Sequence, residues 1–388
     1  MVGITSVKAQ EVEGCVWLND TLPASFATIY CPALGIGTTT DVDGRYLLSE
    51  LPKGEVVLEY AYLGYTTRRV KLTLPEANHR YAHDERLVEQ PIKLDGVFVT
   101  PDGQDPVAYI MERVNKQFAT NKERLQAYEA QMNLEMDERN VDVLYNMMPS
   151  PLRFMMKGMF KMTGYGAIID LCLNNPTVDV DLTCKQTLAG KKVSNSEPRL
   201  THSNVEVSTK AQKQMYKAMT EPLYSMAYSE DYGLDLKNWK KKKFQLQGTI
   251  EENGLDVDVL QSGSYKVYIV EDLWTVLRVE LNTEDQMERL ECRDMGGGIY
   301  LPISYVADFK MPDFIQMDDS MKSLGDSLRL LSDAQFDEMM NEMPMDSIPR
   351  MARGYMRKMM KALHEGRSFM PSLALRFNIR YKGVKVSN

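Results

Sequence analysis

Residues 40–46 read Thr-Asp-Val-Asp-Gly-Arg-Tyr, a turn sequence with β-prone residues on both sides. Gly44 accepts the positive φ that a tight turn needs, and the carboxylates of Asp41 and Asp43 can satisfy turn amides. Outward from this turn, short runs of alternating apolar and polar residues recur between further turn residues, as is typical of an all-β sandwich. We expect its interior to contain Val16, Ala27, Ile29, Leu47 and Leu58.

Three motifs in residues 11–100 resemble those of the carboxypeptidase-regulatory-like domain. They are Gly14-Cys15-Val16 in the first strand, the turn of residues 40–46, and Gly64-Tyr65 late in the domain. The following Leu94–Val99 is similar to the strand that comes after such domains, although Gly96 replaces the usual acidic residue. The resemblance implies a β-sandwich with an accessory role rather than a peptidase active site.

The two ends of this first region suggest how the chain is organised. Val7-Lys8-Ala9 before Gln10 is similar to the small-residue end of a secretory signal peptide, so residues 1–10 are interpreted as the truncated remnant of a signal. The alternative is a frayed terminus. Residues 101–106 contain Gly and Pro and are expected to lead into a second domain, 101–388, whose first helix opens at Asp105.

The second domain contains many runs with a period of two, which is typical of half-buried strands. In the clearest run, polar residues alternate with Tyr128, Ala130, Met132, Leu134 and Met136. Further strands are expected at Val178–Cys184, Phe244–Ile250, Leu255–Leu260, Tyr265–Val270, Leu273–Leu281, Met287–Cys292, Ile299–Met311 and Ala374–Val386. Hairpin-like turns between several of them predict a curved antiparallel sheet. Two Met-rich segments, Leu144–Leu173 and Ser332–Leu363, are long enough to form helices.

The predicted fold class is therefore mainly β with inserted helices. An N-terminal β-sandwich is followed by an α+β domain in which Met-rich helices cover a curved antiparallel sheet. The element order, with Leu273–Val279 followed by Ile299–Pro302, resembles the periplasmic lipoprotein-carrier half-barrel. That resemblance implies an apolar cleft between the sheet and its helices.

Composition narrows the possible partners. The 388 residues carry a formal net charge of −8, which argues against a general nucleic-acid binder because phosphate contacts need a basic face. No uncharged apolar stretch is long enough for a transmembrane helix. The five cysteines are widely spaced; a Cys172–Cys184 disulfide and buried free thiols are both compatible with the sequence.

The Met-rich segments supply the candidate ligand-binding residues. Met is flexible and polarizable, so a methionine wall can adapt to an apolar ligand such as a lipid or an acyl chain. Simple packing onto the sheet and a thioether Cu(I) site are the alternatives. The candidates for an apolar groove are Met155, Met159 and Met162 in one segment and Met356, Met359 and Met360 in the other.

Other motifs favour structural interpretations. Lys240, Lys241, Lys242 and Lys243 could contact an anionic surface, although lysines also protect edge strands from pairing. His79 and His83 are expected in a surface loop rather than at a metal, and Asp41 and Asp43 in a turn rather than a calcium loop. Gly296–Gly298 lacks the Lys and Ser/Thr of a phosphate loop and is expected to form a turn.

Taken together, these features predict a non-catalytic binding or scaffolding protein that is exported to the periplasm or cell surface, associates with the outer membrane and uses no cofactor or metal. It could bind a lipid or another apolar ligand, or an envelope protein. One alternative is a protein–protein interaction module without a ligand cavity. A second alternative is a hydrolase with a spatially assembled site, although the sequence contains no recognisable nucleophile motif.

Overall fold

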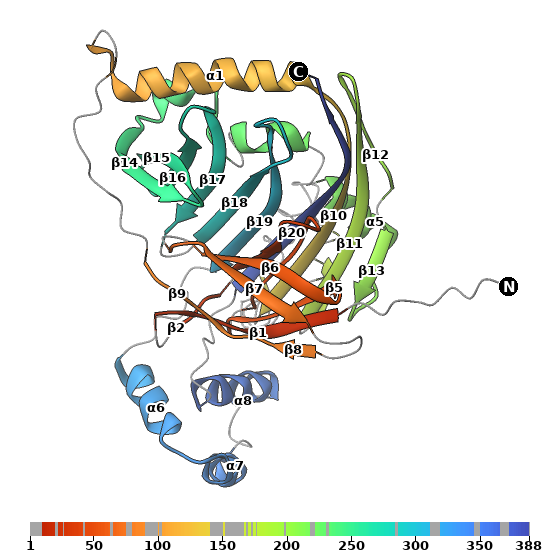
Figure 1. The fold of residues 1–388 in the computed structure, drawn as a ribbon. Coiled ribbons are helices and arrows are strands. Elements are labelled where there is room, and N and C mark those ends of the chain that lie inside the picture. Colours follow the sequence, from red (N-terminus) through yellow and green to blue (C-terminus); the bar gives the residue numbers. More distant parts are fainter. Residues whose placement is uncertain are drawn as a thin grey trace, which may run out of the picture.

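The N-terminal region folds into two packed β-sheets in the computed structural model (Figure 1). In the first sheet β1 lies between β2 and β5 and also pairs with β8 and β9; the second has the order β4-β3-β6-β7. The strands are β1 Gln10–Leu18, β2 Leu22–Pro23, β3 Thr28–Cys31, β4 Ile36–Thr39, β5 Arg45–Leu51, β6 Gly54–Ala61, β7 Arg68–Leu74, β8 Arg80–Ala82 and β9 Glu85–Leu87. This is the predicted sandwich.

The structure describes most, but not all, of the chain. The described residues are 10–19, 22–25, 27–41, 43–62, 65–74, 80–89, 100, 103–139, 150–151, 167, 170–171, 174–175, 177–197, 199–217, 222–229, 233–283, 286–310, 319–344, 350–364 and 372–387. Residues 1–9 of the predicted signal remnant lie outside them, whereas its last residue, Gln10, is the first residue of β1.

The predicted turn forms at Asp41, Asp43 and Gly44. Asp41 Oδ1 accepts hydrogen bonds from the backbone N–H groups of Asp43 and Arg45, both at 2.9 Å. Gly44 has φ of 75°, and a Cβ at this position would lie 2.7 Å from the carbonyl oxygen of Val16. Only glycine therefore fits this site, and the Asp41 carboxylate stabilises the turn.

The prediction for one core residue of the sandwich, Leu47, is wrong. Val16, Ala27, Ile29 and Leu58 are fully buried, but Leu47 is 41% exposed. Its neighbour Leu48 takes the inward position, because β5 alternates with Tyr46 and Leu48 facing the core. A shift of one residue in a strand exchanges its two faces, and two adjacent leucines do not reveal the register.

The strands after the sandwich build one large antiparallel sheet with the order β12-β11-β10-β20-β19-β18-β17-β16-β15-β14, while β13 pairs with β11. Its strands are β10 Leu125–Arg139, β11 Thr177–Ala189, β12 Lys192–Asn195, β13 Arg199–Ser203, β14 Gln245–Glu252, β15 Leu255–Ser262, β16 Tyr265–Val270, β17 Thr275–Asn282, β18 Gln286–Asp294, β19 Tyr300–Lys310 and β20 Ser372–Val386. The predicted meander is correct. However, β17 begins at Thr275 rather than at Leu273, because Asp272 and Trp274 adopt positive φ in a tight turn.

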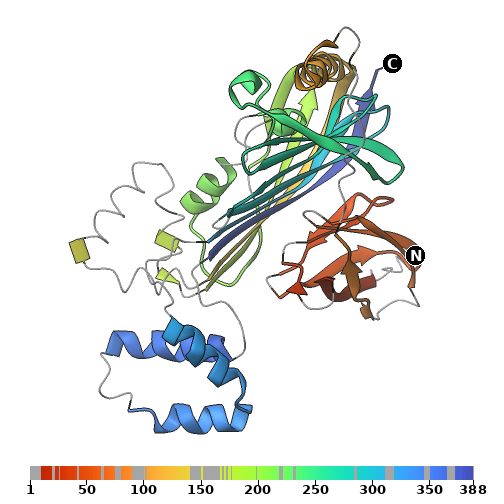
Figure 2. The ribbon, with the colours of Figure 1, turned by 90° about the vertical axis from the view of Figure 1, so that its left-hand side faces the viewer.

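Helices cover the apolar face of this sheet. They are α1 Pro106–Arg124, α5 Thr209–Lys217 and the 3-10 helix η2 Leu223–Tyr228, and all three contribute to the largest hydrophobic cluster. Asp105 caps α1 as predicted, since its side chain accepts a hydrogen bond from Ala108 N at 2.9 Å. Figure 2 shows the sandwich on the opposite side of the sheet from α5.

Three more helices form a separate unit between β19 and β20. They are α6 Asp319–Arg329, α7 Asp333–Glu342 and α8 Arg350–His364, which pack on one another around a hydrophobic cluster of their own. Both views place them away from the large sheet (Figures 1 and 2). The Met-rich α8 therefore does not cover the sheet as expected, because the apolar sides of α6 and α7 bury its methionines instead.

Candidate functional site

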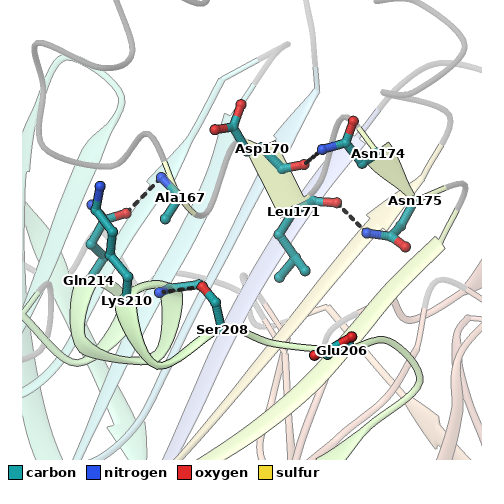
Figure 3. A pocket seen from close by; sticks show the side chains of 10 residues that line it. Ala167, Asp170, Leu171, Asn174, Asn175, Glu206, Ser208, Lys210 and Gln214 are labelled. Atoms are coloured by element: carbon teal, nitrogen blue, oxygen red, sulfur yellow. Dashed lines mark hydrogen bonds between the residues drawn. The ribbon is translucent and has the colours of Figure 1, made fainter.

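A hollow of about 730 Å³ opens beside α5 at the apolar side of the sheet (Figure 3). We call it the α5 hollow. On one side of the hollow, the described lining residues belong to α5 or to the segment just before it. On the other side, they come from the stretch between positions 167 and 175. Together they are Ala167, Asp170, Leu171, Asn174, Asn175, Glu206, Ser208, Lys210, Ala211 and Gln214.

Hydrogen bonds within the lining hold parts of the hollow in place. The Ala167 N–H donates to Gln214 Oε1 at 2.9 Å, which joins the two sides. The side-chain amides of Asn174 and Asn175 donate to backbone carbonyls four residues earlier, both at 2.6 Å. The rim is therefore polar and partly preorganised.

The floor of the α5 hollow is small and apolar. Leu171 and Ala211 are buried and belong to the main hydrophobic cluster, against which Ala167 also packs. The other seven lining side chains are polar or charged, with Asp170 and Glu206 acidic and Lys210 basic. The arrangement can hold an uncharged polar group near an apolar patch, and sequence patterns did not single out these residues.

The predicted groove methionines Met356, Met359 and Met360 are not among the described residues that line this hollow. Met155, Met159 and Met162 lie outside the described residues. Met359 and Met360 are buried in the α6–α8 cluster, and Met356 packs against it. The structure thus brings the three α8 methionines together on one face of their helix, as expected from their spacing, but that face is the interior of a helical unit.

The four consecutive lysines lie before the edge strand β14. Lys240 and Lys241 belong to the 3-10 helix η3, Trp239–Lys241, and Lys242 and Lys243 complete the turn that follows it. All except the half-buried Lys242 are exposed.

The described residues of the other sequence motifs lie in strands or in the connections between them. His83 Nε2 faces Glu85 Oε2 at 3.3 Å in the connection from β8 to β9, whereas His79 lies outside the described residues. Cys184 is a free thiol, and Cys172 lies outside the described residues. Gly297 has φ of 68° in the predicted turn between β18 and β19. Within the described ranges, no cluster of three or more His, Cys, Asp or Glu residues could hold a metal.

A buried ion network joins the sandwich to the other face of the large sheet. We call it the interface ion network. It contains charged side chains from the sandwich and from β14, β17 and β18, each at most 13% exposed: Glu59, Glu252, Arg278, Glu280, Arg289, Glu291 and Arg293.

Two contacts in this network cross between the sandwich and the sheet. Glu59 Oε2 accepts from Arg293 Nε at 3.2 Å, and Thr67 Oγ1 donates to Glu252 Oε1 at 2.9 Å. Glu252 in turn binds Arg278 Nη1 at 2.9 Å. The crossing contacts therefore continue into charges within the sheet.

Charges within the network shift the pKa values of their neighbours. Burial alone would raise the pKa of Glu291, but Arg289, Arg293 and Arg278 lower it to about 2. Burial opposes the charge of Arg278, yet the carboxylates led by Glu252 raise its pKa well above the usual value. Glu291 and Arg278 are consequently charged at neutral pH, as a buried ion pair requires.

Sequence reasoning did not identify this network. Charged residues that alternate along a strand are usually assigned to the solvent face, and nothing local reveals that the sandwich covers that face. The available signal was the run of opposite charges two residues apart, as in Arg289, Glu291 and Arg293, because such residues share one face of a strand.

Two further titratable groups lie outside the hollow and the network. Asp258 is fully buried in β15, and Thr249 Oγ1 donates to its Oδ1 at 3.3 Å. Burial and the nearby Glu271 carboxylate raise the pKa of Asp258 to about 7. His364, the last residue of α8, points its Nδ1 at the Leu328 carbonyl (2.8 Å).

His364 thus connects all three helices of the α6–α8 unit. Its Nε2 lies 3.2 Å from Asp333 Oδ1 at the start of α7, and its ring stacks on Phe336 with centroids 4.3 Å apart. The Leu328 carbonyl and the Asp333 carboxylate raise the pKa of His364. With an acceptor at each ring nitrogen, the imidazolium is the form that satisfies both contacts.

Comparison with known proteins supports the first resemblance. Residues 12–99 match the family described as CarboxypepD_reg-like domain. TonB-dependent receptor P39 of Formosa agariphila is 31% identical over 112 residues, which make up 29% of this chain and 10% of the receptor. The chain thus spans about a tenth of the length of this curated relative.

Solved structures add little. A LolA superfamily protein from Nitrosomonas europaea is 7% identical, with 71% of this chain and 94% of that chain covered and a TM-score of 0.20. A type II cohesin–X–dockerin complex from Acetivibrio cellulolyticus is 13% identical, with 28% and 73% covered and a TM-score of 0.19. Scores this low support no conclusion, so the likeness to a lipoprotein carrier stays a prediction.

Within the described residues, no helix has the length and apolar character needed to cross a bilayer.

Proposed function

We propose that this chain is a non-catalytic binding protein associated with the bacterial cell envelope, and that its ligand binds in the α5 hollow. The hollow carries the proposal, because its volume of about 730 Å³ falls within the ~300–1,000 Å³ of small-molecule sites. The CarboxypepD_reg-like match supports an accessory, non-catalytic role, and the receptor relative supports association with the envelope.

The lining favours a ligand that carries polar groups. Only Ala167, Leu171 and Ala211 are apolar among the ten described lining residues. A bare acyl chain would bury the remaining polar groups. These groups would lose their hydrogen bonds to water and gain none from the chain, which costs free energy for each group. We therefore expect the ligand to set a small apolar part on Leu171 and Ala211 and to present hydrogen-bonding groups to the rim.

The experiment is native mass spectrometry of the protein purified from its own envelope fraction. We expect the spectrum of the unmodified protein to show the added mass of a non-covalently bound ligand. The Ala167→Trp variant should lose this added mass because the indole fills the hollow. The matched control is Ala189→Trp, which adds the same side chain at an exposed position at the end of β11.

Two results would contradict the proposal. Retention of the ligand by a folded Ala167→Trp variant would place the ligand elsewhere. An unmodified protein that carries no small molecule but repeatedly co-purifies with another envelope protein would favour the alternative, a protein–protein interaction module.

A further inference from the structure

The four consecutive lysines and Lys237 form an exposed basic surface, which we call the lysine turn (Lys237 and Lys240–Lys243). Lys237, Lys240, Lys241 and Lys243 are exposed to solvent. The turn is held in position, because Trp239 packs against the main hydrophobic cluster and Ser262 Oγ donates a hydrogen bond to the Lys242 carbonyl. The backbone from which these lysine side chains extend is therefore held in place.

Protection of the sheet edge does not explain the lysine turn. Edge strands avoid unwanted pairing when charged residues lie along the strand itself. The edge strand β14, Gln245–Glu252, has the sequence QLQGTIEE and contains no lysine. The lysines all precede it, where no strand-pairing groups need to be protected.

The positive charges of the lysine turn are not neutralised by the described residues. None of these lysines forms an ion pair with a carboxylate in the part of the chain that the structure describes, although the protein carries a net charge of −8. Two of these lysines lie near aromatic rings. Lys240 Nζ lies 5.5 Å from the Trp239 ring centroid, and Lys242 Nζ lies 5.5 Å from that of Tyr265.

We propose that the lysine turn is a docking surface for an anionic phospholipid bilayer. Lysine ammonium groups on long, flexible stems suit a fluid layer of phosphate headgroups, and each adds roughly fivefold to the partition coefficient near such a surface. Trp and Tyr favour the same interface because their rings are apolar with one polar end. The lysine turn shares no residue with the α5 hollow, so this inference holds whether or not the hollow binds a ligand.

Co-sedimentation of the full chain with vesicles tests this proposal. We expect binding to vesicles that contain phosphatidylglycerol, little binding to phosphatidylcholine alone, and weakening at high salt because exposed charges are screened. The variant Lys240→Gln/Lys241→Gln/Lys243→Gln should lose affinity on the order of a hundredfold. Replacement of the same three lysines by Arg should retain binding, because the charge remains.

The control variant removes the same charge elsewhere. Lys53, Lys191 and Lys192 are also exposed, and their replacement by Gln should leave vesicle binding within a few-fold of the unmodified protein. The proposal is overturned if phosphatidylglycerol vesicles are not bound, or if the control variant loses as much affinity as the test variant. It is also overturned if the turn binds soluble polyglutamate but no vesicles, which would indicate an acidic protein partner.

Discussion

Replacement of Glu59 by Ala tests whether the interface ion network holds the sandwich on the large sheet. Glu59 is 1% exposed and contacts two arginines, Arg69 of the sandwich at 2.6 Å and Arg293 of β18 at 3.2 Å. The variant would leave Arg293 buried with Glu291, at 2.9 Å, as its remaining carboxylate partner among the described residues.

The expected cost follows from this geometry. Removal of one partner from a buried ion pair costs about 3–5 kcal/mol, because the other charge stays desolvated. Arg293 keeps Glu291, and Arg69 is half-exposed and can turn to water. We therefore expect a loss of about 2–4 kcal/mol in the free energy of unfolding.

Glu55→Ala provides the matched control. Glu55 lies on the same strand, β6, and pairs with Lys71 at 2.8 Å, but its side chain is 63% exposed. Exposed ion pairs contribute about 0–1 kcal/mol, so this variant should unfold almost as the unmodified protein does.

The assay is urea unfolding of the full chain followed by fluorescence, with a double-mutant cycle between Glu59→Ala and Arg293→Met. Because the two side chains are in contact, we expect a coupling energy of about 1–3 kcal/mol. If Glu59→Ala costs no more than Glu55→Ala, or if the coupling is near zero, the ion network does not hold the two parts together.

Three further substitutions have defined outcomes. Gly44→Val should lower stability by about 1–3 kcal/mol, since a β-branched residue resists positive φ; an unchanged urea midpoint would refute the turn's role. Burial raises the pKa of Asp258 to about 7, so the folded state takes up a proton that the unfolded chain, with a pKa near ~4, does not hold. Stability should therefore rise as pH falls from about 8 to 5, and Asp258→Asn should flatten that dependence in pH-dependent unfolding. The exposed Asp256→Asn should leave most of the dependence, because the Asp256 carboxylate raises the pKa of Asp258 less than burial and Glu271 do. The Leu328 carbonyl and the Asp333 carboxylate raise the pKa of His364. Its contribution to the stability of the α6–α8 unit is therefore present at low pH and is lost as pH rises through that pKa. Peroxide oxidation of the α8 methionines, read by mass spectrometry, should then accelerate at high pH; equal pH dependence in His364→Gln would refute this.

The sequence by itself determined the features that depend on near neighbours. The turn at Gly44 could be predicted because its φ and its hydrogen bonds from Asp41 involve residues a few positions apart. The strand β10 could be predicted because a period of two marks one buried face. The α1 cap at Asp105 has the same local origin.

Only the tertiary structure decided what covers each face. Periodicity identifies the apolar side of α8 but does not say whether a sheet or other helices bury it, and Met359 and Met360 pack within the α6–α8 unit. Likewise, Arg278 and Glu291 occupy the polar face of their strands, yet the sandwich and neighbouring charges bury them completely. Leu171 and the helix α5 line one hollow only because the chain brings them together. Contacts between distant segments set the surroundings of these side chains, and no local pattern encodes them.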